Sequence, residues 1–184
     1  MHRAQIELLV IESQIGNMAA FEQLCRYFHP RLLRFAFKIC HSEEMAHDAV
    51  QNAWLAINKS LARVKDPRAF NSWVYQATRW QVLDLLRAQQ RDEQWRVQDD
   101  VEAIAPEQAD SDSVLLGAIN MLPTIDREVV HLFYLEQMTI QEISLVLEIP
   151  DGTVKSRLNR ARNSLRDKLT GADYEYRSTN KTRA

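Results

Sequence analysis

The sequence TIQEISLVLEIPDGTVKSRLNRAR occupies residues 139–162 and decides the fold class. Residues 139–147 have the apolar spacing of a short amphipathic helix, with Thr139 in the N-cap position. The next four residues, Glu-Ile-Pro-Asp at 148–151, interrupt that pattern, and a second helix opens at Gly152. Two short helices joined by a tight turn predict a helix-turn-helix unit.

The second helix of this unit has an apolar face and a basic, polar face. Its inward positions are spaced four, three and four residues apart: Val154, Leu158, Ala161 and Leu165. Between Lys155 and Lys168 there are six basic residues and one acidic residue. A helix that enters the major groove needs this division, because arginine pairs with guanine while lysine and serine hold phosphate. The side chains expected to contact duplex DNA are Thr153, Lys155, Ser156, Arg157, Asn159 and Arg160.

The rest of the 184-residue chain also favours helices. Gly and Pro are scarce, at 4 and 5 residues, and Ala, Leu, Gln, Glu and Arg dominate. Apolar residues recur at helical steps from Phe21 to Ile39, and Pro30 should kink that helix or divide it into two. A second helix should begin after an N-cap at Ser42, and a third should run from about residue 70 to residue 90. The fold class is therefore all-α.

An acidic segment separates two helical domains. Residues 98–113 contain six acidic residues, one proline and no lysine or arginine, which is typical of a flexible, solvated linker. Helical periodicity resumes at Val114 and continues to Leu169. We therefore expect a domain at 1–96, an acidic linker at 97–113, a helix-turn-helix domain at 114–170 and a flexible tail at 171–184.

Composition narrows the classes of function. The formal net charge of −2 requires that any nucleic acid be bound by local basic patches. The N-terminus has no signal-peptide pattern, and no apolar run approaches the roughly 20 residues that span a bilayer. We therefore expect a cytoplasmic protein without membrane insertion. The sequence has no glycine-rich phosphate loop and no recognisable Ser-His-Asp arrangement, so we expect neither an enzyme nor a bound cofactor.

One metal-binding alternative remains open. Cys25 and His29 are four residues apart on an expected helix, with Cys40, His41 and His47 downstream. Four such groups can bind zinc, but the spacing matches no strong motif and Cys25 has a packing position. Metal analysis of the reduced protein would decide between a metal or redox role and simple packing.

Two features of the N-terminal half suggest binding surfaces. On the helix after Ser42, one outward face carries Asp48, Gln51, Asn52 and Leu55. An exposed leucine beside polar groups suggests docking, although single surface leucines are ordinary. Further on, residues 70–91 interleave aromatic rings with arginines, a mixture that suits single-stranded DNA. Trp73 fits either that role or the rim of the core.

Combined, these motifs resemble the extracytoplasmic-function (ECF) group of bacterial RNA polymerase sigma factors, from Phe21 to Leu169. Residues 21–24 and 29–36 resemble the opening of the first conserved domain, and residues 46–54 resemble the polymerase-docking helix. Residues 70–91 resemble the segment that recognises and melts the −10 promoter element. Leu122-Pro123, residues 127–130, 152–158 and 160–162 resemble the domain that reads the −35 element.

The resemblance implies a transcription initiation factor that joins core RNA polymerase and binds promoter DNA. Polymerase would contact Asp48, Gln51, Asn52 and Leu55, although an acidic residue is more usual at position 52. A loop at about residues 64–69 would help to capture a flipped −10 base. The residues implied for the −10 element are Lys65, Arg68, Trp73, Arg79, Trp80 and Arg87. Trp80 stands where the family often has asparagine, and Ile140-Gln141 replaces a common aromatic-acidic pair, so both changes bear on promoter preference.

Further expectations and one alternative follow from the resemblance. Relatives are commonly held inactive by an anti-sigma factor, so we expect such a partner here. The near-neutral charge predicts little specific promoter binding by the free protein, and tight binding at physiological salt would contradict this. The alternative function is a conventional helix-turn-helix transcriptional regulator that acts without joining polymerase.

Overall fold

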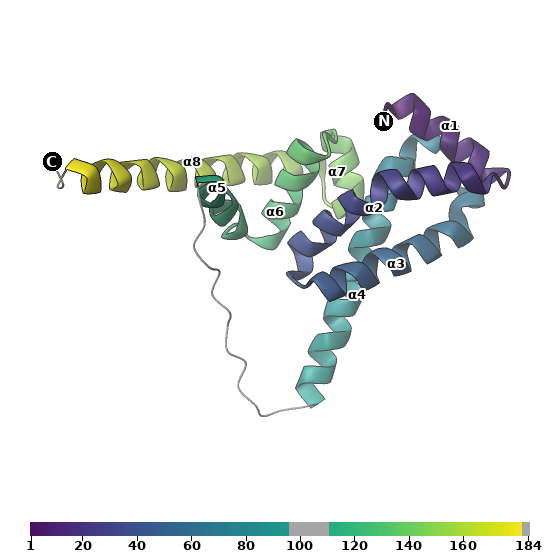
Figure 1. Ribbon diagram of the computed structural model, residues 1–184, viewed down its shortest axis with the longest axis horizontal. Coiled ribbons are helices and arrows are strands. Elements are labelled where there is room, and N and C mark those ends of the chain that lie inside the picture. Colours follow the sequence, from purple (N-terminus) through teal and green to yellow (C-terminus); the bar gives the residue numbers. More distant parts are fainter. Residues whose placement is uncertain (96–110, 182–184) are drawn as a thin grey trace. The chain divides into compact units, whose positions relative to one another are not determined.

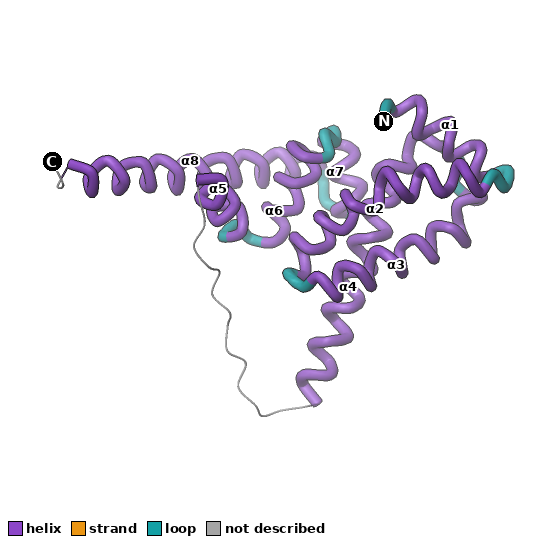
Figure 2. Tube along the Cα trace, viewed as in Figure 1, coloured by secondary structure: helices purple, strands orange, loops and turns teal. Residues whose placement is uncertain are grey.

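The computed structural model describes residues 1–95 and 111–181, with side chains at 1–91 and 115–169. Every regular element in these ranges is helical, which confirms the all-α fold (Figure 2). Contacts divide the chain into two compact units, Met1–Val97 with Gln141–Ile149 and Gln98–Ile140 with Pro150–Ala184. The expected domain limits differ from this division at residues 141–149, because this short segment makes its contacts with the first unit. No described helix combines the length and apolar character needed to cross a bilayer.

The first unit is built mainly from four helices (Figure 1). They and two short 3-10 turns are α1 (Arg3–Gln14), α2 (Met18–Cys40), α3 (Glu43–Ser60), η1 (Leu61–Arg63), η2 (Pro67–Ala69) and α4 (Phe70–Trp95). Helix α3 packs on α2 and α4, and α1 packs on α2. The segment α7 (Ile140–Leu147) also belongs to this unit by its contacts.

Aromatic rings fill the centre of the first unit. Phe28 lies 5.6 Å from Phe70 and 6.4 Å from Tyr75 between ring centroids, and Phe35 lies 5.3 Å from Tyr75. All four rings are fully buried. The predicted inward face of α2 is confirmed, except that Phe21 at its start is half-buried.

Pro30 does not divide α2, which is continuous from Met18 to Cys40. A proline inside a helix removes one backbone hydrogen bond and costs about 3 kcal/mol. Here the exposed Pro30 is flanked by buried Phe28 and Leu32, so packing on both sides holds the helix together. The predicted N-cap of α3 is confirmed, since the Ser42 hydroxyl accepts a hydrogen bond from the backbone N–H of Met45 at 3.2 Å.

The second unit packs three helices around a small core. Its elements are α5 (Ser111–Asn120), α6 (Thr124–Val130), the π-helical turn η3 (His131–Leu135) and α8 (Asp151–Lys181). Both α5 and α6 pack on α8. Leu122, Val130 and Ala161 form a buried cluster, with Leu165 packed against it.

The C-terminal helix is longer than expected. Helix α8 continues to Lys181, so the predicted end of helical structure near Leu169 is wrong. The segment after Leu169 contains one glycine and no proline, and a single glycine costs a helix only about 1 kcal/mol. The predicted acidic linker lies mostly outside the described residues.

Candidate functional site

Helix α8 begins directly after the turn that the sequence predicted. Glu148 ends α7 in a left-handed conformation, with φ 57°, and the Ser144 hydroxyl donates to the carbonyl of Ile149 at 2.6 Å. The carbonyl of Pro150 then accepts hydrogen bonds from the backbone N–H groups of Thr153 and Val154, at 2.8 and 3.1 Å. These bonds fix where α8 starts and therefore which side chains its first turns present.

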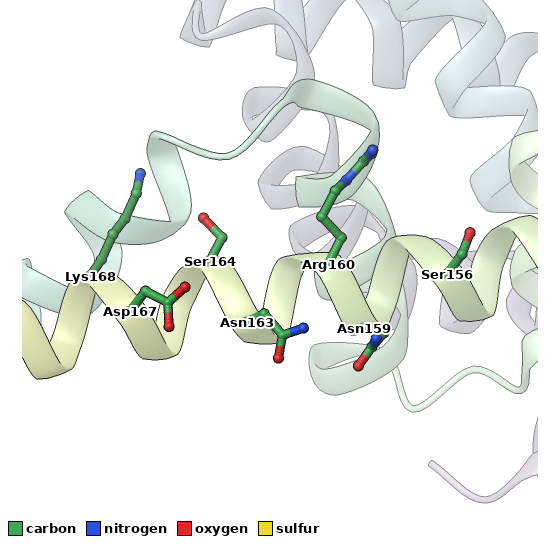
Figure 3. Close-up of a pocket in the computed structure, with 7 residues that line it drawn as sticks. All are labelled: Ser156, Asn159, Arg160, Asn163, Ser164, Asp167 and Lys168. Atoms are coloured by element: carbon green, nitrogen blue, oxygen red, sulfur yellow. The ribbon is translucent and has the colours of Figure 1, made fainter.

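The two faces of α8 are those expected from its spacing. Val154, Leu158 and Ala161 are buried, while Lys155, Ser156, Asn159 and Arg160 are exposed and Thr153 is half-buried. A shallow hollow runs along the exposed side of the helix (Figure 3). Its lining residues are Ser156, Asn159, Arg160, Asn163, Ser164, Asp167 and Lys168. Hydroxyl, amide and cationic groups, together with the carboxylate of Asp167, therefore line a surface that can form hydrogen bonds with DNA.

The sequence reasoning missed a buried carboxylate beneath this face, Asp126 of α6. It is 1% exposed, and Arg157 Nη1 donates to its Oδ1 at 3.0 Å. Arg160 donates from Nε to Oδ2 at 2.9 Å and from Nη2 to Oδ1 at 2.8 Å. Burial alone would raise the pKa of Asp126, but the hydrogen bonds from Arg160 and Arg157 outweigh it and lower the pKa below its usual value.

Other arginines of the second unit have structural partners. Buried Arg127 donates from Nη1 to the carbonyl of Asn120 at 2.8 Å and from Nη2 to the Thr124 hydroxyl at 3.2 Å. It thereby joins the end of α5 to the start of α6, and its burial lowers its pKa. Arg162 donates from Nε to the Tyr134 hydroxyl at 2.7 Å. Arg157, Arg160 and Arg162 of α8 therefore each have a hydrogen-bond partner within the second unit.

The outward face of α3 has the predicted composition. Asp48, Gln51, Asn52 and Leu55 are all exposed, and their spacing puts them on one side of the helix. The opposite side is buried through Ala46, Ala49, Val50, Ala53 and Ile57. An exposed leucine framed by polar side chains is available to a protein partner.

The loop between α3 and α4 is held in place by hydrogen bonds. Gln14 of α1 donates from Nε2 to the carbonyls of Leu61 and Val64, at 3.0 and 2.7 Å. Arg68 donates from Nε and Nη2 to the two carboxylate oxygens of Asp66, at 3.0 and 3.1 Å. The side-chain and backbone hydrogen bonds from Arg68 lower the pKa of Asp66. Arg68, predicted to contact DNA, is thus paired within its own loop.

A hollow beside this loop brings two predicted residues together. Lys65 is exposed at its edge, and Trp73 of α4 is half-buried, with its ring 5.8 Å from that of Phe70. The other lining residues are Ser60, Arg63, Val64, Asp66, Ala69, Ser72, Gln76 and Leu145. Trp73 therefore lies at the rim of the core, packed against Phe70 and also lining the hollow.

The remaining predicted residues of α4 lie farther along the helix. Trp80 and Arg87 are exposed and follow Trp73 at intervals of seven residues, so all three share one side of α4. Arg87 donates from Nη1 to Asp84 at 3.1 Å, and Arg79 is half-buried. The structure therefore aligns Trp73, Trp80 and Arg87 on one side of α4, while Arg79 is half-buried and the exposed Arg68 is paired with Asp66 in the loop.

Neither cysteine has the surroundings of a metal ligand or a reactive thiol. Within the described residues, no group of three or more Cys, His, Asp or Glu side chains has metal-binding geometry. Both cysteines are free thiols. Burial, with a smaller contribution from the charge of Glu22, raises the pKa of Cys25 to about 11. The Cys40 thiol contacts the carbonyl oxygens of Ala36 and Ser42, at 3.2 and 3.3 Å.

Two family models match successive parts of the chain. Sigma-70 region 2 matches residues 24–92, and Sigma-70, region 4 matches residues 113–165. The first match includes α3, the loop and most of α4. The second includes α6, α7 and the exposed face of α8. The residues predicted to contact polymerase or DNA therefore all lie inside the matched regions, while the α8 hollow extends past them to Asp167 and Lys168.

Curated relatives and solved structures agree with these matches. The ECF RNA polymerase sigma factor SigM of Mycobacterium tuberculosis is 30% identical over 165 residues, 89% of this chain and 83% of that protein. SigE of Mycolicibacterium smegmatis is 29% identical over 161 residues, and the match spans 83% of this chain but 62% of SigE. The structure of CnrH in complex with the cytosolic domain of CnrY matches with a TM-score of 0.67 and 26% identity, covering 91% of this chain and 98% of that one. The sigma factor RpoE of Bartonella quintana, solved with the anti-sigma factor NepR, matches with a TM-score of 0.64 and 25% identity, covering 82% and 96%.

Proposed function

The chain belongs to the extracytoplasmic-function group of RNA polymerase sigma factors, and we propose that it directs core RNA polymerase to specific promoters. The observation that carries this proposal is the succession of region 2 and region 4 on one chain, each with an exposed candidate surface. A conventional helix-turn-helix regulator needs a DNA-reading unit but no region 2, so the match at residues 24–92 disfavours that alternative. Catalysis of RNA synthesis belongs to the polymerase, and this chain acts as an initiation factor, not an enzyme.

In this proposal, α3 docks on the polymerase. Its exposed face offers one apolar side chain, Leu55, surrounded by Asp48, Gln51 and Asn52. Burial of Leu55 supplies affinity, while the polar groups fix orientation through hydrogen bonds. Because the far side of α3 is packed against α2 and α4, the docking face is held rigid before it meets its partner.

The hollow beside residues 64–69 receives an unstacked base of the −10 element. Trp73 offers a ring for stacking there, and Lys65 a cation for phosphate. Unstacking a base costs a few kcal/mol, and stacking on an aromatic ring returns about 1–3 kcal/mol per base. Trp80 and Arg87 continue the same side of α4 and extend the path for the melted strand.

The exposed face of α8 reads the −35 element as duplex DNA. Lys155 and Ser156 in its first turns are suited to phosphate, and Asn159 and Arg160 to base edges. Two separate contacts, one to duplex and one to melted DNA, define a promoter by position as well as by sequence.

We also propose that a protein inhibitor controls this factor. CnrH was solved with the cytosolic domain of CnrY, and RpoE with the anti-sigma factor NepR. An inhibitor of this kind would cover the surfaces assigned here to polymerase and DNA. Because the proposed partner is core RNA polymerase, we place the protein's activity in the bacterial cytoplasm.

Transcription in vitro from a promoter library tests the proposal, with core polymerase alone and with this protein added. We expect selective initiation that is lost when Asp48→Ala and Gln51→Ala are combined. The matched control combines Glu43→Ala with Gln23→Ala, an exposed carboxylate at the start of α3 before residues 46–54 and an exposed amide on α2. That control should retain initiation if the docking face is assigned correctly.

Two outcomes contradict different parts of the proposal. Initiation that survives Asp48→Ala with Gln51→Ala would contradict the docking face while leaving the function intact. No added initiation, together with specific duplex binding by the protein alone, would instead favour the conventional regulator.

A further inference from the structure

Asp126 is the least exposed of the buried charged side chains that the structure describes in the second unit. Its side chain is 1% exposed, yet it lies directly beneath the solvent-facing side of α8. It accepts three hydrogen bonds of 2.8–3.0 Å from Arg157 and Arg160, two residues assigned from sequence to DNA contact. A buried carboxylate that binds two arginines therefore constrains both of their side chains.

The two arginines differ in how much of each remains available. The side chain of Arg157 is 27% exposed, and that of Arg160 is 61% exposed. The bonds to Asp126 use two of the five N–H donors of Arg160, those on Nε and Nη2. The outer edge of the guanidinium still has enough donors for a bidentate contact with guanine. One edge of the Arg160 guanidinium is therefore bound to Asp126, and the other edge faces outward.

A hydrogen-bonded carboxylate changes how an arginine side chain can contact DNA. A long, mobile cation follows the phosphate backbone, which carries no sequence information. A guanidinium fixed in one plane loses less conformational freedom when it pairs with a base, and it cannot swing to a neighbouring phosphate. Lys155 is exposed in the first turns of α8, which suits a contact to phosphate.

We propose that Asp126 is a positioning residue for −35 recognition: it holds Arg160 in the plane that reads a base and uses Arg157 as a second anchor. This inference rests on the proposed reading of duplex DNA by α8. It predicts opposite effects on specificity and on general DNA affinity when Asp126 is changed. Freed arginines reach more phosphates, so binding to arbitrary DNA strengthens while discrimination between bases weakens.

The test uses holoenzyme assembled from core polymerase and full-length protein, on a library randomised in both promoter elements. Asp126→Asn keeps the side-chain shape but places an amide N–H where a carboxylate oxygen accepts a hydrogen bond. We expect discrimination at one −35 position to fall roughly tenfold, with −10 preferences unchanged. The slope of log affinity against log salt for −35 duplex should steepen by about 0.9 for each phosphate gained.

Glu148→Gln is the matched control. It removes the same single negative charge from an exposed position in the helix-turn-helix, before α8 begins and outside the lining of the α8 hollow. We expect its base preferences at −35 to equal those of the wild type. Loss of discrimination in both variants would show a general charge effect and overturn the positioning role.

Arg160→Lys is a second variant that tests the contact between this arginine and a base. Lysine keeps the positive charge but cannot bond in bidentate fashion to the carboxylate or to guanine. We expect the same loss of discrimination, and Asp126→Asn should add little to it in the double variant. If Asp126→Asn abolishes cooperative unfolding of the second unit, Asp126→Glu takes its place, because it keeps the negative charge but moves the carboxylate relative to the two arginines. Wild-type −35 discrimination in that variant would overturn the positioning role.

The outcomes separate this inference from the proposed function. A wild-type −35 preference that survives in both Asp126→Asn and Arg160→Lys would overturn the role of Asp126 alone. A wild-type holoenzyme with no −35 preference would overturn the proposed reading of DNA by α8, and this inference with it.

Discussion

Phe28 is the position where a single truncation should do most damage to the first unit. It is 1% exposed, and its ring lies 5.6 Å from Phe70 and 6.4 Å from Tyr75. Burial of a phenyl side chain contributes about 1.5–3 kcal/mol, and each ring pair adds about 0.5–1.5 kcal/mol. Phe28→Ala should therefore lower the free energy of unfolding by about 3–5 kcal/mol. The free energy of unfolding of a domain is about 5–15 kcal/mol in total. The change therefore removes a large share of the stability on which the α3 surface depends.

Tryptophan fluorescence during urea unfolding of the full-length chain measures this effect. All four tryptophans (Trp54, Trp73, Trp80 and Trp95) lie in the first unit, so their signal reports that unit alone. The control is Phe37→Ala on the same helix, where the ring is 36% exposed and truncation should cost about 1 kcal/mol or less. Equal losses in the two variants would refute the assignment of Phe28 to the centre of the core.

Two further predictions concern titratable groups. The pKa of Asp126 is lowered in the folded state, so its ion pairs should stabilise the second unit above about pH 4 and lose that effect as the pH falls through the folded value. The stability difference between wild type and Asp126→Asn, followed by circular dichroism in urea, should therefore shrink on acidification, and a constant difference would contradict the pairing. With a pKa of about 11, Cys25 should be about one part in a thousand thiolate at pH 8. In a Cys40→Ser variant its reaction with a disulfide reagent should be roughly a hundredfold slower folded than in urea, and similar rates would contradict its burial.

The sequence predicted the features that depend on local spacing. Apolar residues at helical intervals identified the inward faces of α2 and α8, and the Ser42 cap located the start of α3. The same periodicity identified the outward side chains of α3, because a residue opposite a buried stripe must face solvent. The motifs that resembled sigma factors are carried on these helices, so the family was readable without a structure.

Local spacing misjudged features whose outcome depends on neighbouring elements. Pro30 was expected to kink α2 or divide it, and the division does not occur, because buried residues on both sides keep the helix continuous. Arg68 was predicted to contact DNA and remains exposed, but the sequence reasoning did not include the ion pair that Asp66 forms with its guanidinium. In both cases a local preference of the residue competes with a contact that it makes in the folded chain. The sequence indicates the preference but not the geometry of the contact.

What the sequence by itself determined is which face of each helix is buried and which residue types remain outside. What only the tertiary structure decided is the partner of each charged group. Asp126 is separated from Arg157 by 31 residues and from Arg160 by 34, and no local pattern links them. The physical reason is that periodicity records the direction of a side chain from its own helix, whereas an ion pair depends on how α6 and α8 pack.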